Sequence, residues 1–162
     1  MWLGTDELHV VLLNAPSTGG LSNSTTETCK HINVGRYESV MFVLTIGTNS
    51  VTTSNFYLME ASTATAAGQY TAAYNYRIAS TAAAATTATD TLSARAAGVS
   101  TALVMSSTAE TMYVIEVKNT GLTEGYSFVY PSVSSAAATR NIAAVAICRP
   151  RYIQNSMLVP NS

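Results

Sequence analysis

The chain has 162 residues, of which 48% are hydrophobic and only 10% are Asp, Glu, Lys or Arg; its net charge is −1 and its mean hydropathy is +0.20. An ordinary domain carries about 25% charged residues, so most of this surface must consist of small, hydroxyl-bearing and tyrosine side chains. This composition argues against nucleic-acid binding, which needs clustered Lys and Arg, and no apolar run approaches the roughly 20 residues of a membrane helix. The length is that of one domain of ordinary size. The N-terminus lacks the basic start of a signal peptide, so we expect the protein to be made and kept in the cytosol.

Strand signals separated by turn residues dominate the first third of the chain. Residues 7–13 predict a first strand, and the polar stretch 22–28 predicts a loop. Residues 37–46 give the strongest signal, because both faces of this segment are apolar. Such a pattern is typical of a central strand that is covered on each side. Residues 55–62 predict the next strand.

A row of tyrosines follows in residues 70–78. Tyr70, Tyr74 and Tyr76 share the two-residue period of one sheet face, although the alternation breaks between Tyr70 and Tyr74. We expect these rings to pack with their hydroxyls at the rim of a sheet. The alternative is an aromatic stripe that binds a partner or a sugar.

The second half of the chain is less regular at first. Residues 80–97 mix an alanine run, which favours helix, with threonines, which disfavour it, and we interpret them as a long loop entering a short strand at 90–97. Together with 101–105, this region is alternatively a bent pair of strands. Three further strands are predicted at 111–117, 125–130 and 141–148. The last two precede Pro131 and Pro150, which cannot donate to a strand ladder.

The end of the last strand carries the one dense basic cluster. Arg149, Arg151 and Tyr152 surround Pro150. In one interpretation the arginines solvate the end of a strand; in the other, Arg and Tyr anchor a protein interface. The candidate interface residues are Tyr70, Tyr74, Tyr76, Arg149, Arg151, Tyr152, Met157 and Leu158.

About eight strands without a helix-length periodic segment predict an all-β fold. We expect an antiparallel β-sandwich of a jelly-roll-like kind. Residues 1–153 should form this single domain. Residues 154–162 should form a C-terminal arm or tail, which either frays or reaches a neighbouring subunit.

The sequence offers little for chemistry. Cys29 and His31 are the nearest approach to a metal-ligand pair, and His9 is the only other histidine, so a four-ligand zinc site lacks partners. Cys148 is expected to be a buried core thiol; a disulfide with Cys29 stays open, although reducing cytosol argues against it. Motifs for nucleotide binding and nucleophilic catalysis are missing from the sequence. We therefore expect neither an enzyme nor a cofactor.

Several of these segments together resemble the small structural proteins of tailed bacteriophages that decorate or cement the capsid. The resemblance follows the chain order through VMFVLTIG at 40–47, FYLMEAS at 56–62, YRI at 76–78, DTL at 90–92, AAGV at 96–99, YVIEV at 113–117, AAVAI at 143–147 and RPRY at 149–152. It spans about three quarters of the chain, and its order carries more weight than any single piece. The Ala/Thr-rich stretch 82–89 departs from the pattern, which leaves a position on the tail or at the head–tail junction open.

The resemblance implies a virion component without catalysis, assembled in the host cytoplasm and held on the capsid surface. Its partners would be the major capsid protein and sister copies in a homo-oligomer, with neither nucleic acid nor membrane involved. The competing expectation is a carbohydrate- or receptor-binding module of a phage tail or fibre. In that case the tyrosine row would form a stacking platform.

Overall fold

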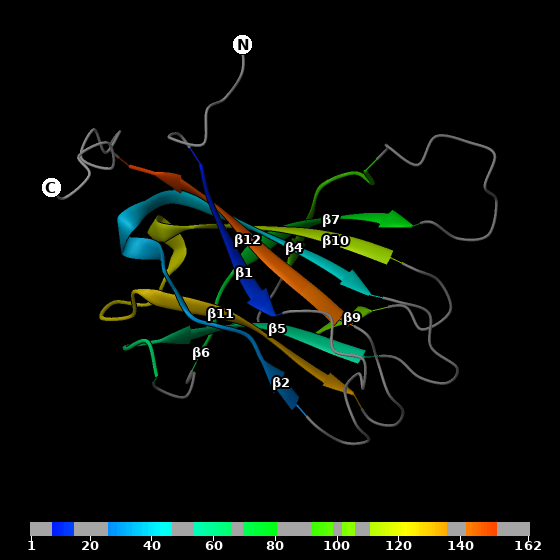
Figure 1. The fold of residues 1–162 in the computed structure, drawn as a ribbon, viewed down its shortest axis with the longest axis horizontal. Coiled ribbons are helices and arrows are strands. Elements are labelled where there is room, and N and C mark those ends of the chain that lie inside the picture. The colour runs from blue at the N-terminus through cyan, green and yellow to red at the C-terminus, as the bar shows by residue number, and fades with distance from the viewer. Residues whose placement is uncertain are drawn as a thin grey trace, which may run out of the picture.

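The computed structural model describes residues 8–14, 26–46, 54–65, 70–80, 92–98, 102–105, 111–135 and 142–151. Across these ranges the regular elements are strands and two short 3-10 turns, η1 (Val34–Arg36) and η2 (Asn119–Gly121). The strands form two antiparallel sheets packed face to face, which confirms the predicted all-β sandwich (Figure 1). Three candidate residues, Tyr152, Met157 and Leu158, lie outside the described residues, as does the expected arm at 154–162.

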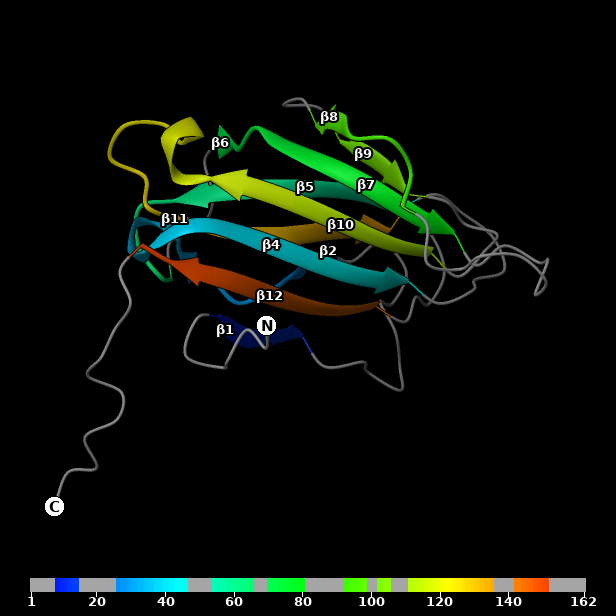
Figure 2. The ribbon, with the colours of Figure 1, turned by 90° about the horizontal axis from the view of Figure 1, so that it is seen from above.

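Within the described residues, each sheet contains six strands. Sheet A has the order β1 (His9–Asn14), β12 (Ile142–Pro150), β4 (Tyr37–Ile46), β10 (Thr111–Lys118), β7 (Tyr74–Ser80) and β8 (Ala96–Gly98). Sheet B has the order β2 (Thr26–Thr28), β11 (Phe128–Ser135), β5 (Ser54–Ala61) and β6 (Tyr70–Thr71), with β3 (Ile32–Asn33) paired to β11 and β9 (Leu103–Met105) paired to β5. Figure 2 shows β1, β12, β4, β10 and β7 side by side in that order.

The pairing of eight of these strands defines a jelly roll. In sheet A the first strand, β1, lies beside the last, β12, followed by β4 and β10; in sheet B the order is β2, β11, β5, β6. Consecutive strands therefore pass repeatedly from one sheet to the other. These eight strands form the framework of the sandwich, and the described part of the chain adds four more. They are β3, beside β11, and the insertion β7, β8 and β9, which widens both sheets on the side of β10 and β5.

Two boundaries differ from the sequence expectation. The polar segment predicted as a loop contains β2, whose Thr26 and Thr28 are exposed, so this edge strand has no apolar period to reveal it. The strand predicted to stop before Pro131 continues through it to Ser135. The Pro131 carbonyl accepts from the Cys29 N–H at 3.0 Å. The backbone N and O of a strand residue point to the same side. The nitrogen of Pro131, which has no hydrogen to donate, therefore faces the gap between β2 and β3, and no hydrogen bond between β11 and β5 is lost.

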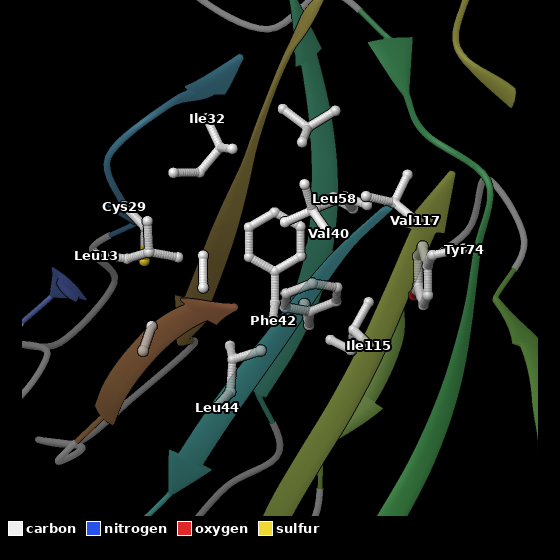
Figure 3. Close-up of a cluster of buried hydrophobic side chains, with 14 of the residues drawn as sticks. Leu13, Cys29, Ile32, Val40, Phe42, Leu44, Leu58, Tyr74, Ile115 and Val117 are labelled. Atoms are coloured by element: carbon white, nitrogen blue, oxygen red, sulfur yellow. The ribbon is translucent and has the colours of Figure 1, made fainter. Parts of the chain in front are cut away.

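The core lies between the sheets and is built by alternate residues of each long strand. β5, β10 and β12 all bury every second side chain. Phe42, Leu44 and Leu58 are fully buried at its centre (Figure 3). Burial of each such side chain contributes about 1.5–3 kcal/mol. A buried carboxylate, Glu60, accepts a hydrogen bond from the Thr123 backbone N–H at 3.0 Å, which ties the η2 turn to sheet B.

Candidate interaction surfaces

The structure divides the tyrosine row between the two sheets. Tyr70 belongs to β6 and pairs with Glu60 in sheet B, whereas Tyr74 and Tyr76 belong to β7 in sheet A. The chain crosses between the sheets at Ala72, whose N–H donates to the Leu58 carbonyl at 2.7 Å. The expectation of one shared face was therefore wrong. The break in the alternation is the crossing point itself.

Tyr74 is a core residue rather than an interface residue. Its side chain is 5% exposed, and its ring meets Phe56 edge to face with ring centres 5.6 Å apart. Burial raises the pKa of Tyr74 to about 12, and the nearby Tyr76 adds to the shift. Tyr76 is half-buried against the same core. The expected stacking platform is thus incorrect at Tyr74, because its ring is turned inward between the sheets.

Gly98 explains how the Tyr74 ring fits. The glycine lies opposite Tyr74 in the β7–β8 pair, and a Cβ placed on it would come within 2.0 Å of the ring. A side chain at this position would displace the ring from the core. Gly98 therefore allows β8 to pack directly over Tyr74.

The basic cluster lies at one end of sheet A. Arg149 and Glu38 form an ion pair with Nε and Oε2 3.2 Å apart, and both side chains are exposed. The Nε of Arg151 donates to the Tyr37 carbonyl at 3.3 Å. An exposed pair of this kind contributes at most about 1 kcal/mol. Both arginines thus engage β4 of their own chain, an arrangement that fits the solvating interpretation and still leaves their exposed surface for contacts.

A further candidate surface, which the sequence did not reveal, is the outer face of sheet A. It is formed by the outward-pointing residues of four neighbouring strands. Register places these residues in cross-strand rows, which include Thr45, beside Met112 and Ala143, and Glu116, beside Met41. The apolar members of the rows are Val10, Leu12, Met41, Val43, Met112, Val114, Ala143, Val145 and Ile147. Val10 and Leu12 are 68% and 53% exposed, and the others are half-buried. In Figure 2 no described element crosses in front of β12, β4 and β10.

The signal for this face was present in the strand at 37–46. Its apolar residues on both sides led to the expectation of cover on each side, and the structure supplies cover only from sheet B among the described residues. Along β7, Arg77 lies beside Val114, and other charged residues lie towards one end of the face. There Glu116 pairs with Arg95 at 3.1 Å, and a hollow of about 250 Å³ is lined in part by Leu8, Met41 and Lys118.

The outer face of sheet B has a different chemistry. Cross-strand register places Tyr57 beside Ser132 and Thr28, and Met59 beside Tyr130. The Tyr130 ring lies under His31 with ring centres 4.1 Å apart. Tyr130 and Ser132 are buried, so Thr28 and Tyr57 are the more accessible hydroxyl-bearing residues of this group. The outer face of sheet A carries mainly aliphatic and methionine side chains instead.

The described residues provide little reactive chemistry. Cys29 and Cys148 are both buried, and no disulfide joins them, which answers the open question of a bridge. Burial raises the pKa of the Cys148 thiol to about 11, so it stays protonated at neutral pH. Within the described ranges, no three His, Cys, Asp or Glu residues gather to hold a metal ion. A helix that could span a membrane is likewise not found in that part of the chain.

Comparison with known proteins adds no relative. No family model, curated protein or solved structure matches the chain. The class of protein is therefore defined by the fold alone, a single-chain jelly-roll sandwich with one largely apolar outer face. Its function has to be argued from that surface.

Proposed function

We propose that this chain is a structural protein of a tailed-bacteriophage virion, which decorates or cements the capsid shell by binding across neighbouring subunits. One observation carries the proposal: the outer face of sheet A is a largely apolar surface four strands wide with no described element over it, as expected of a chain that works in an assembly with sister copies and capsid subunits. Monomeric proteins rarely expose contiguous apolar surface of this extent unless it binds something. The shell as partner rests on the resemblance of the strand segments to phage decoration proteins.

The composition suits such a role. Ala, Ser, Thr and Val side chains lose little rotamer entropy when they are immobilised, and uncharged groups are desolvated at low cost. Each copy can then contribute modest binding free energy, which the repeated lattice of the shell multiplies. The proposed role involves no catalysis and no cofactor.

The competing function, a carbohydrate- or receptor-binding module, has weaker support. Jelly rolls serve lectins as well as capsids, so the fold does not separate the two. The expected platform depended on three tyrosines in one row, and Tyr74 is buried while Tyr70 belongs to the other sheet. Copy number distinguishes the two functions, because a shell protein is needed at every lattice position and a fibre tip only at a few.

The direct experiment is quantitative mass spectrometry of purified phage particles that contain the chain. The proposal predicts a copy number comparable to that of the major capsid protein. A few copies per particle would assign the chain to the tail or fibre instead. Particles assembled without the chain should take up the purified protein to the same stoichiometry.

The contribution of the C-terminal arm needs a cut that preserves the fold. β12 extends to Pro150, so truncation after Cys148 would shorten a strand, whereas truncation after Arg151 keeps every described strand. We expect the variant truncated after Arg151 to fold normally and to load poorly onto shells. Full loading would remove the arm from the binding surface.

A further inference from the structure

We propose that the outer face of sheet A is a self-association surface, on which a second copy of the chain packs with the same face. The two sheets would then stack across a two-fold axis in the way that sheets stack inside a β-sandwich. This inference concerns the purified protein and stands or falls separately from the role on a virion.

The strand pattern is the first argument. β4, β10 and β12 carry apolar side chains on both faces over part of their length, with polar or charged residues on the outer face beyond it. An apolar stretch of this kind is typical of strands that are buried on both sides. In the single chain only their inner faces are covered by described elements. A second copy on the outer face would give Met41, Val43 and Val145 the burial that their side chains indicate. Strands with only one buried face normally alternate apolar and polar residues instead.

The size of the face is the second argument. Strands lie about 4.8 Å apart and rise about 3.4 Å per residue, so the apolar centre, four strands by about six residues, covers about 400 Å² in projection. The five longer strands of sheet A together cover about 650 Å² in projection, and side chains add to the accessible area. A stable interface buries about 800 Å² on each partner. The apolar centre would thus supply about half of the area that a dimer buries, and the polar and charged residues around it, Thr45, Arg77 and Glu116 among them, would supply most of the rest.

Shape favours a second copy, and the charges of the face leave an uncharged region for it. The acidic groups Glu38 and Glu116 are paired with Arg149 and Arg95 of the same chain. Arg77 and Lys118 lie on the face beside Val114 and Ser39, whereas the outward residues of β1, β12 and β4 in the rows of Val10 and Leu12 carry no charge. Two sheets with the same twist pack face to face at about −30° with interdigitating side chains. The outer face of a second copy has this same twist and is therefore complementary in shape to the first. Such an isologous contact closes as a dimer.

Sedimentation equilibrium of the full purified chain tests the inference. The test variant carries Val10→Lys and Leu12→Lys, since both side chains are exposed in the single chain and their replacement should leave its fold intact. The matched control is Val104→Lys, which changes another exposed strand valine, 59% accessible, on sheet B. Circular dichroism and thermal melts verify that all three proteins fold.

The wild-type chain should sediment as a dimer with a Kd of about 1 µM or lower. The double lysine variant should raise the Kd by at least about 100-fold, because association would then bury two unpaired lysine charges on each copy. The Val104→Lys control should associate as the wild type does. If the double variant unfolds, Val43→Thr with Val145→Thr replaces it and should also weaken association. A wild-type monomer well above this concentration, or equal association of wild type and face variants, overturns the proposal.

Discussion

At the scale of single residues, close packing around Tyr74 sets local tolerance to change. Gly98→Ala should lower the free energy of unfolding by about 1–3 kcal/mol, because its Cβ would overlap the Tyr74 ring and overpack the core. Gly121→Ala is the matched control, since nothing lies within 4 Å of its added Cβ. Urea denaturation of both variants measures the difference. Equal stability of the two variants would contradict the packing of β8 over Tyr74.

The buried Tyr74 hydroxyl gives a second residue-scale prediction. It has no hydrogen-bond partner among the described residues. Removing an unsatisfied buried hydroxyl relieves its desolvation penalty, so Tyr74→Phe should leave stability unchanged or raise it by about 1 kcal/mol. A loss of more than about 1 kcal/mol in thermal or urea unfolding would show that the hydroxyl is bonded.

The buried Cys148 thiol should make the stability of the fold depend on pH. Its pKa is raised by burial from 9.0 to about 11, so folding favours the neutral thiol. Below pH 9 the thiol is protonated in both states and contributes nothing; between pH 9 and about 11 the unfolded chain gains the thiolate, and stability falls. Denaturation at stepped pH values should show a steeper decline in the wild type than in Cys148→Ala. Parallel declines would exclude Cys148 as the cause.

At the scale of elements, the sequence revealed those strands whose two faces differ in a regular way or are both apolar. The strands at 37–46, 55–62 and 111–117 were found because period two is a local property of the chain. Which of the two sheets a strand joins is not determined by its local sequence. Tyr70 and Tyr74 lie four residues apart in different sheets, and only the tertiary crossing at Ala72 decides this.

The candidate surface was hidden for the same reason. The sequence indicated two apolar faces on one strand, but which face the second sheet would cover depends on register across strands far apart in sequence. His9 to Asn14 pairs with residues near the C-terminus, and this pairing brings Val10 and Leu12 onto the face. The sequence did reveal the cluster of Arg149 and Arg151 at the end of the last strand. Its contacts with Glu38 and Tyr37 required the structure.

Neighbouring residues of β4 separate folding from association. Phe42 is fully buried between the sheets, whereas Val43 points outward. Phe42→Ala should lower the free energy of unfolding by about 3–5 kcal/mol at any protein concentration. Val43→Thr should change the stability of the single chain little and weaken association instead. Chemical denaturation at two protein concentrations distinguishes the two effects, and a concentration-independent loss for Val43→Thr would argue against the outer face as an interface.

At the scale of the whole molecule, the jelly roll presents two unlike outer faces. One is largely apolar, and the other carries hydroxyls and aromatic rings. Such a molecule can associate with its own kind through one face and bind a different surface through the rest. This division is compatible with the proposed role on a shell, where sister copies and capsid subunits must both be contacted.

The central claim is that the outer face of sheet A is covered in the working form of the protein. Methionine oxidation of the native protein, read by mass spectrometry, tests it most directly. Met41 and Met112 lie on this face, Met59 lies on the outer face of sheet B, and all three are half-buried in the single chain; fully buried Met105 is the protected reference. The account predicts that Met41 and Met112 oxidise much more slowly than Met59, and that dilution or the Val10→Lys, Leu12→Lys variant abolishes the difference. Equal oxidation of the three methionines in the concentrated wild-type protein would contradict it.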